Sequence, residues 1–188
     1  MTEKAQRSRG SQTRAAILAA ARARFAADGY EKATIRAIAA DAHIDPSMVM
    51  RYYGNKEQLF AAAVDIDLEL PDLAAVPADE LPQVVVRHFL QRWEGDAADD
   101  ALLLLLRSAV TNQKAAEHMR SIFMKQVSPA FGAALDDREA AERAALVSCQ
   151  LLGLALGRYL LAIPAVTSQP VDTLVDRYAP AILAVLER

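Results

Sequence analysis

Glycine, cysteine and aromatic residues are scarce in this chain. It contains seven glycines and one cysteine among 188 residues, and only 6% of its residues are aromatic. Strand-like alternation of Val, Ile and Thr is almost missing, whereas alanine, the strongest helix former, is abundant. These features exclude an internal disulfide framework and predict an all-α fold, in a chain long enough for one domain or two small ones.

The lone cysteine, Cys149, lies in a leucine-rich stretch, where we expect a buried thiol typical of a reducing cytoplasm. Residues 1–10 are polar and predict a disordered start rather than a signal peptide. The most apolar window, residues 145–163, nearly matches a membrane span in length, but it contains Gln150 and Arg158. A buried helix at a subunit interface explains this window better than a membrane-associated sensor does. We therefore expect a cytoplasmic protein with no membrane partner.

The chain also lacks the parts that enzymes and metal proteins need. It has no glycine-rich phosphate loop, no nucleophile elbow and no Cys–His pair with a positioned third group. Ser148 and Cys149 fall in an apolar helix with no base nearby in the sequence. His88 and His118 have no cysteine or carboxylate at metal-ligand spacing except the adjacent Glu117, which a helix directs elsewhere. We predict no enzyme, no metal site and no cofactor.

Charge is distributed unevenly, although the net charge is only −3. Residues 1–60 hold ten Lys/Arg and six Asp/Glu, whereas residues 61–188 hold eleven Lys/Arg and eighteen Asp/Glu. Such asymmetry indicates that the basic part meets an anion. The acidic part is consistent either with a cationic ligand or with repulsion of nucleic-acid phosphate.

Two helices are predicted at the start of the chain. A helical period runs over residues 11–30 and is stopped by Gly29, as a C-terminal capping glycine would stop it. Thr34 is a good N-cap for a short second helix that ends near Asp41.

Two further helices follow at once. Asp45 before Pro46 is a strong start for a third helix over residues 46–53, because proline at the first helical position loses no hydrogen bond. Asn55 can cap a fourth helix that runs towards residue 67. The connection before the third helix matches a helix-turn-helix, with His43 expected at the position of positive φ.

The remaining chain reads as a helical bundle. Residues 70–82 contain three prolines and predict a linker. The apolar run 102–106 predicts an enclosed helix. Helices are predicted at about 83–94, 98–110, 113–134 (bent near Pro129), 138–163 and 171–187 (bent at Pro180).

The third helix carries a polar, aromatic and basic face. Ser47 and Arg51 are four residues apart and share this face, whereas Val49 points to the core. In the major groove of duplex DNA, an arginine here can pair with guanine, and methionines can touch a thymine methyl. Tyrosine hydroxyls and a lysine at the next helix start suit phosphate. The candidate DNA contacts are Thr34, Arg36, Pro46, Ser47, Met48, Met50, Arg51, Tyr52, Tyr53 and Lys56.

An ordered set of residues over 14–60 has a specific spacing. The set is Ile17, Ala20-Ala21, Phe25, Gly29-Tyr30, Ala33-Thr34-Ile35, Ile38-Ala39, Ala42, Tyr52-Tyr53, Lys56-Glu57 and Leu59-Phe60. This segment resembles the N-terminal domain of TetR-family transcriptional regulators. The resemblance implies an all-α homodimer. A DNA-binding domain would cover residues 10–60, with the helix-turn-helix at about 34–53, and a ligand-binding and dimerisation domain would cover 61–188.

The same resemblance assigns roles within the candidate DNA contacts, and it also shows departures. Base or groove contacts fall at Arg36, Ser47, Met48, Met50, Arg51 and Tyr52, and phosphate contacts at Thr34, Tyr53 and Lys56. His43 replaces the usual turn glycine, Met50 replaces a common tyrosine, and Tyr53 stands where phenylalanine is more usual. These departures concern which bases are read, not the class of protein.

The second domain matches the family less specifically. Its last two helices look like the family's dimer-forming pair, and Gly153 and Gly157 lie on one face, where they would let helices approach closely. The expected dimer contacts are Leu152, Gly153, Leu156, Gly157, Leu160, Leu174, Tyr178 and Ile182. An inducer pocket is expected among His88, Trp93, Asn112, His118, Phe123, Gln150 and Tyr159.

The sequence thus predicts a sequence-specific DNA-binding transcriptional regulator, a ligand-responsive repressor that binds a palindromic operator as a dimer. Its partners would be duplex DNA, a second copy of itself and a small-molecule inducer of unknown identity. The alternative is a helical protein that binds a small molecule or a partner and whose first domain no longer reads DNA. His43 and Met50 are the residues that favour this alternative.

Overall fold

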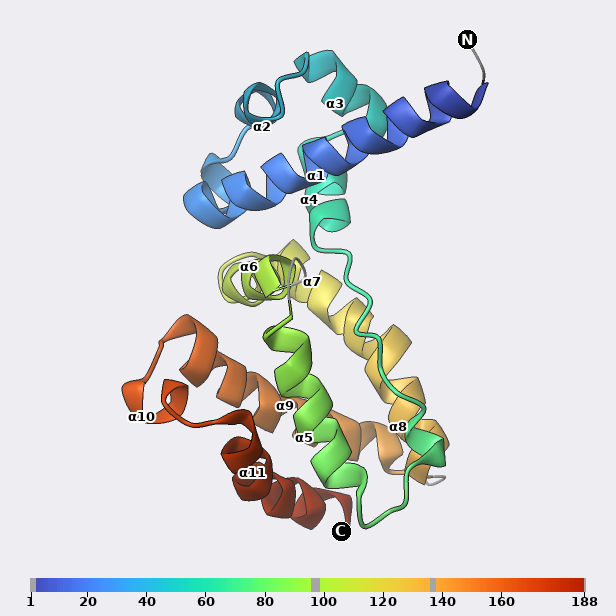
Figure 1. Ribbon diagram of the computed structural model, residues 1–188, viewed down its shortest axis with the longest axis vertical. Helices are drawn as coiled ribbons and strands as arrows, with labels where there is room; N and C mark the ends of the chain where they lie inside the picture. The colour runs from blue at the N-terminus through green and yellow to red at the C-terminus, as the bar shows by residue number, and fades with distance from the viewer. Residues whose placement is uncertain (1–2, 96–98, 136–137, 188) are drawn as a thin grey trace. The chain divides into compact units, whose positions relative to one another are not determined.

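The computed structural model describes residues 3–95, 99–135 and 138–187, leaving aside the side chains of residues 3–9, 99 and 100. Every element in these ranges is helical, as the composition predicts. The first four are α1 Glu3–Lys32, α2 Ile35–Asp41, α3 Pro46–Tyr53 and α4 Lys56–Ala63 (Figure 1). After a short 3-10 turn, Leu73–Ala75, come α5 Leu81–Trp93, α6 Asp99–Ala109, α7 Gln113–Ile122, α8 Ser128–Leu135, α9 Ala140–Ala155, α10 Pro164–Thr167 and α11 Val171–Leu186.

The chain forms two compact units, and their bounds differ from a single division at residue 60. The first unit, here called the head, comprises Met1–Ile66 and Asp100–Ala116; the second, the body, comprises Asp67–Asp99 and Glu117–Arg188. Within the head, Lys114 forms an ion pair with Glu57, and the Asn112 amide donates to Glu31 at 3.5 Å. The structure therefore adds residues 100–116 to the head.

Short polar side chains begin the small helices of the head, as the sequence predicts. The Thr34 hydroxyl accepts from the Ala37 N–H at 3.1 Å, the Asp45 carboxylate from the Ser47 N–H at 2.8 Å, and the Asn55 side chain from the Gln58 N–H at 2.8 Å. Each bond satisfies a backbone donor that the first helical turn leaves without a partner.

A tight apolar core holds these helices in one arrangement. Five large side chains from α1 to α4 are at most 1% exposed: Ile17, Phe25, Ile38, Val49 and Leu59. Phe25, Tyr30 and Phe60 add a group of three aromatic rings whose centroids lie 5.0 to 5.9 Å apart. Because α2 and α3 have only seven and eight residues, this packing rather than helix propensity keeps them folded.

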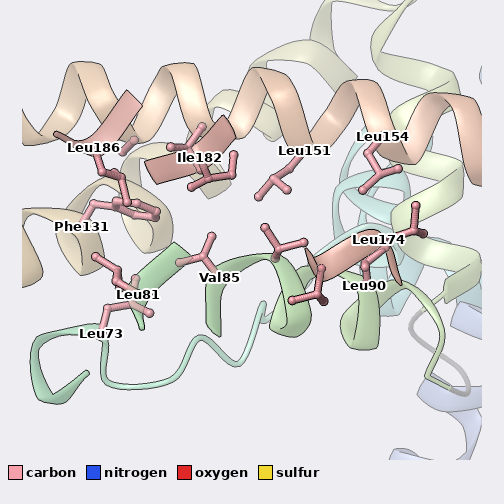
Figure 2. Packing of buried hydrophobic residues seen from close by; sticks show 14 residues of the cluster. Leu73, Leu81, Val85, Leu90, Phe131, Leu151, Leu154, Leu174, Ile182 and Leu186 are labelled. Atoms are coloured by element: carbon pink, nitrogen blue, oxygen red, sulfur yellow. The ribbon is translucent and has the colours of Figure 1, made fainter. Parts of the chain in front are cut away.

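The body has its own core between α5, α8, α9 and α11, with Leu73 at its edge (Figure 2). Figure 2 shows Val85 and Leu90 of α5 facing Leu151 and Leu154 of α9, with residues of α11 between them. Two of these α11 residues, Leu174 and Ile182, are 3% and 0% exposed within one subunit. Their role as dimer contacts stays a prediction, which their enclosure within their own chain does not favour.

Several local predictions need correction. Helix α1 begins at Glu3, so residues 3–10 are helical rather than disordered, and α4 ends at Ala63 rather than near residue 67. The helix predicted over 113–134 is interrupted by a π-turn at Phe123–Val127, just before its proline, and α10 was not predicted. Cys149 is exposed rather than buried.

The structure also describes the most apolar window of the sequence, residues 145–163, most of which lies in α9. In the described part of the chain, Ala140–Leu160 is the one helix long and apolar enough to cross a membrane, and a third of its 18-residue apolar window is buried. Arg158 near its end pairs with Glu94 at 2.8 Å and donates to the carbonyls of Val166 and Gln169 at 2.8 and 3.0 Å. These contacts hold the end of the helix against residues 94, 166 and 169 of the same chain, and they do not support a membrane-spanning role.

We expect Ile38→Ala to destabilise the protein by about 3 kcal/mol, because it removes a fully enclosed side chain and leaves a cavity. Urea unfolding followed by circular dichroism measures the change. Met50→Ala is the matched control on the neighbouring helix: Met50 is 46% exposed, so its truncation should leave stability nearly unchanged. Equal losses in the two variants would contradict the core described here.

Candidate nucleic-acid interface

The turn between α2 and α3 sets the direction in which α3 leaves the head. His43 has φ 55°, the positive value expected for it. The His43 N–H donates to the Ala40 carbonyl at 3.1 Å, and the Ile44 N–H donates to the Ala39 carbonyl at 3.0 Å. This pair of bonds is the Schellman motif, in which glycine is the usual residue at the left-handed position. Histidine thus occupies a glycine position without changing the turn.

Helix α3 starts directly after this turn. Asp45 caps it, Pro46 is its first residue, and the Met48 N–H donates to the Asp45 carbonyl at 2.9 Å. The hydrogen bonds from Ser47 hold the pKa of the Asp45 carboxyl below its usual value. The carboxylate therefore stays charged at neutral pH and continues to cap the helix.

One side of α3 is anchored and the other is open. Val49 is fully buried in the head core, whereas Ser47, Met50 and Arg51 are exposed and Met48 is half-buried. This is the division expected of a helix that packs by one face and reads a partner by the other. Thr34 and Arg36, at the start of α2, are exposed as well.

An ion pair fixes α2 on α1. Arg24 donates to both carboxylate oxygens of Asp41, at 2.8 and 2.6 Å, and it also reaches Asp28 at 3.2 Å. The guanidinium holds the pKa of Asp41 below its usual value, because it stabilises the ionised carboxylate. This two-bond pairing of Arg24 with Asp41 joins the last turn of α2 to α1, and so it positions the turn that follows α2.

The two adjacent tyrosines of α3 have different environments. The Tyr52 ring contacts two guanidinium groups, with the Cζ atoms of Arg14 and Arg51 at 5.3 and 5.4 Å from its centroid. The Tyr53 hydroxyl donates to the Arg14 carbonyl at 3.2 Å, and burial raises its pKa. Since a phenol has one proton to donate, Tyr53 ties α3 to α1 here instead of offering that proton to phosphate.

Lys56, at the start of α4, is partly engaged within the head. Its ammonium donates to the Glu31 carbonyl at 3.0 Å and lies 4.6 Å from the centroid of the Tyr30 ring. An ammonium has three donors, so this bond leaves two for an anion. The contacts also hold the ammonium at one place on the surface.

Comparisons with known proteins agree with this geometry. Residues 17–63 match the model of bacterial regulatory proteins of the tetR family, and residues 79–186 match that of the tetracyclin repressor-like C-terminal domain. The chain belongs to the TetR family. It is thus a helix-turn-helix transcriptional regulator by family, and the resemblance seen in its sequence is confirmed.

Individual relatives support the assignment. A TetR-family regulator from Streptomyces coelicolor A3 is 32% identical, with a TM-score of 0.67 over 95% of this chain and 96% of that one. The HTH-type transcriptional repressor SCO4008 of Streptomyces coelicolor is 43% identical over 68 residues, which are 36% of this chain and about a third (34%) of that repressor. The structure of a SmeT–triclosan complex, 20% identical with a TM-score of 0.67 over 93% and 90% of the two chains, shows the same fold.

The residues expected to form the inducer pocket of this TetR-family chain have separate environments. Trp93 is 6% exposed and stacks on Tyr159 with ring centroids 5.2 Å apart, and the Tyr159 hydroxyl donates to Glu94 at 3.1 Å. His88 bonds the Leu68 carbonyl at 3.0 Å. Phe123 packs against the body core, whereas His118 and Gln150 are half-buried.

Among the pocket candidates, Asn112 has a different environment from the rest. It lies in the head, and its side-chain oxygen accepts from the Ala115 N–H at 3.0 Å to begin α7. Both ends of the Asn112 side chain are hydrogen-bonded within the head, and its pocket role stays a prediction.

The expected dimer contacts also differ in how exposed they are within one chain. Gly153 is exposed, and a Cβ atom placed on it would meet no atom within 4 Å, whereas one on Gly157 would lie 3.6 Å from Ile163 of the same chain. Leu156 is 37% exposed, and Leu152, Leu160 and Tyr178 are half-buried.

Two residues that matter for the interface were not foreseen from the sequence. Arg14 contacts both tyrosines of α3, and Arg24 fixes α2. The available signal was the run of residues 4–27, which contains six Lys/Arg and no Asp/Glu. Helical periodicity could not single out these two arginines, because their partners lie on other helices.

We expect His43→Gly to stabilise the protein by about 1 kcal/mol, since glycine takes a positive φ without the cost that an L side chain incurs. Thermal unfolding followed by circular dichroism measures the gain. His43→Asn should fall between wild type and glycine, and His43→Val should be less stable than wild type. A glycine variant less stable than wild type would show that the histidine ring contributes more than the backbone strain costs.

Proposed function

We propose that this TetR-family chain is a ligand-responsive transcriptional repressor that binds a palindromic operator as a homodimer in the cytoplasm. The observation that carries the proposal is the outer face of α3, where Ser47, Met50 and Arg51 are exposed while Val49 anchors the helix. The N-terminal residues of a recognition helix are those that meet base edges in the major groove. Here they begin at a capped, proline-started turn that leaves α3 little freedom.

The exposed residues suit distinct parts of a DNA site. Arg51 can donate two hydrogen bonds to O6 and N7 of guanine, and Met50 can touch a thymine methyl. Arg36, on the open side of α2, is a further base contact, and Thr34 can meet phosphate with its hydroxyl or its N–H. Lys56 adds a phosphate contact from the start of α4, with its position set by Glu31 and Tyr30.

The alternative of a head that no longer reads DNA loses part of its support. His43 is one of the two residues that favour this alternative, yet the turn keeps the Schellman hydrogen bonds around this residue. Met50 is the other, and its side chain is open to a partner rather than used in packing. His43 and Met50 are therefore better explained as changes in which bases the head contacts than as a loss of DNA binding.

An exposed apolar strip on α9 and on the π-turn that follows it, Leu156–Leu160, supports the dimer. Leu146 and Leu156 are 50% and 37% exposed, and Cys149 and Gly153 are exposed between them. Contiguous apolar surface on a helix marks an interaction site, and a second copy is the partner that the family implies. A dimer would place two α3 helices in successive major grooves, about 34–36 Å apart on B-DNA.

Ligand binding belongs to the body in this proposal. Trp93, Tyr159 and Phe123 offer aromatic surface, and Glu94, His88 and Gln150 offer polar groups that could orient a small molecule. SmeT, which shares the fold, has been solved with triclosan, so triclosan is a reasonable first probe. A ligand changes operator affinity only if it binds the DNA-competent and the incompetent dimer with different affinity.

We expect Arg51→Ala to weaken binding to an operator duplex by about 1–3 kcal/mol and to relax the preference at one base pair in each half-site. The operator duplex is one that the wild-type protein enriches, and fluorescence anisotropy measures the affinity. Arg177→Ala, at an exposed position of α11 in the body, is the charge-matched control and should bind as wild type does. A variant at Arg51 that keeps full discrimination against scrambled DNA would refute its role as a base reader.

We expect Gly153→Glu to give a folded monomer, because the new side chain meets open space in its own chain but would place a charge in the dimer contact. Gly132→Glu on α8 is the matched control, since a Cβ atom there also meets nothing within 4 Å. Sedimentation equilibrium compares the two. A dimer that survives Gly153→Glu unchanged would move the interface away from this face of α9.

A further inference from the structure

The chain leaves the head just before Asp67, and the first residues of the body are held there by three side chains. The Leu68 N–H donates to the side-chain oxygen of Gln126 at 2.8 Å, and the Leu68 carbonyl is hydrogen-bonded to Nε2 of His88 at 3.0 Å. The Asp67 carbonyl accepts two bonds from the Arg92 guanidinium, at 2.6 and 3.2 Å. We call His88, Arg92 and Gln126 the Leu68 clamp.

The clamp supplies hydrogen bonds that secondary structure does not supply here. Residues 65–72 belong to no helix, so their backbone groups have no helical ladder to join. Leu68 is half-buried, and a buried backbone group without a partner costs free energy. Next to it, Glu69 has φ 52°, and its N–H donates to the Asp67 carboxylate at 2.9 Å. The path of the chain at this point therefore depends on side chains rather than on a helix or a sheet.

The clamp is built from the same elements as the expected inducer pocket. His88 and Arg92 are one turn apart on α5, and Gln126 lies in the π-turn that begins at Phe123. Such π-turns are frequent at functional sites. His88 and Phe123 are both expected pocket residues, so a small molecule bound beside them would also meet the clamp.

The chemistry of His88 indicates how a ligand would act on the clamp. A carbonyl oxygen only accepts hydrogen bonds, so Nε2 of His88 carries the proton that it donates to Leu68. A ligand with an acceptor group, such as a carbonyl or carboxylate oxygen, would compete for this same N–H. If the ligand takes it, the Leu68 carbonyl loses its partner, and the closed form of the clamp is destabilised.

We propose that the Leu68 clamp regulates operator binding, and that an acceptor-bearing ligand opens it by taking the His88 N–H. The inference rests on the proposed function and adds the regulation of the operator-binding dimer. Two linked heads bind two half-sites together only when the linking chain holds them at a matching distance. A closed clamp narrows the range of paths that this chain takes, and an open clamp widens it. A ligand that favours the open form thus lowers operator affinity.

The test opens the clamp without any ligand. His88→Phe/Gln126→Met keeps two side chains of similar size and removes both bonds to Leu68. Loss of one such bond shifts an equilibrium by about two- to tenfold. Affinity for the enriched palindrome, measured by fluorescence anisotropy, should fall by about that factor or more. Affinity for a duplex with a single half-site should not change, because one head binds it without regard to spacing.

Operator spacing gives a second measurement on the same variant. One added base pair moves the second half-site by about 3.4 Å along the DNA axis. Wild-type protein should prefer the enriched spacing to spacings one base pair longer or shorter. In the double variant this preference should shrink by about two- to tenfold, because the heads reach a wider range of distances.

Gln91→Met is the matched control, since it makes the same change at an exposed position of α5. It should bind every duplex as wild type does. Hydrogen exchange reports the clamp itself in the free protein. In His88→Phe, which leaves Gln126 in place, the Leu68 amide should exchange about two- to tenfold faster than in wild type. Circular dichroism melting confirms that each variant is folded.

Three outcomes would overturn the regulatory role of the clamp. Wild-type operator affinity and spacing preference in the double variant would show that the clamp does not govern the heads, whether or not Leu68 exchanges faster. An equal loss on the single half-site would place the effect in the head. An equal loss in Gln91→Met would show a general sensitivity of α5.

Failure of the broader proposal has a different signature. If wild-type protein binds enriched and scrambled duplexes equally, sequence-specific recognition is refuted, and the regulation that rests on it is refuted as well. If wild type discriminates between them and prefers one spacing, while the double variant matches it in both respects, only the role of the clamp is refuted.

Discussion

The burial of Val49 is the constraint on which the reading face depends. Helix α3 has eight residues, too few to be stable alone, so its rotation about its own axis is set by the one side chain it commits to the core. With Val49 enclosed by the head, Ser47, Met50 and Arg51 necessarily fall outside. A slip of one residue along α3 would bury Met48 or Met50 and turn Arg51 towards the protein.

Hydrogen bonds at the helix ends make that packing unique. The Schellman turn at His43, the Asp45 cap and the Arg24–Asp41 fork each join one element to the next within a few residues of α3. On the other side, Tyr53 ties α3 to the backbone of α1. The interface is thus preorganised, so little conformational entropy has to be lost when DNA binds.

Much of the head could be predicted from sequence because its signals are local. The caps at Thr34, Asp45 and Asn55 each act within three residues of themselves, and the strained position of His43 follows from the spacing of two helices. The contacts of Arg14 and Arg24 with α2 and α3 span 17 or more positions in the sequence, so periodicity does not report them.

The packing of the body was less predictable, because it too depends on contacts between residues far apart in the sequence. An apolar helix looks alike whether its residues meet their own chain or a partner, and so Leu174 and Ile182 were assigned to the dimer although they fill the core of one subunit. Cys149 was expected inside and lies outside, on the strip of α9 that supports the dimer. Arg158 appeared as an interruption of an apolar run, yet it pairs with Glu94 and holds a turn.

The central claim is that the outer face of α3, presented twice by a dimer, reads a DNA sequence. Selection of duplexes from a random pool by the purified wild-type protein at near-physiological salt tests it most directly. The account predicts enrichment of a palindrome whose half-site centres are about one helical turn of DNA, or a multiple of it, apart. Recovery of no common sequence, with binding that vanishes as salt is raised, would leave only charge attraction and would contradict the claim.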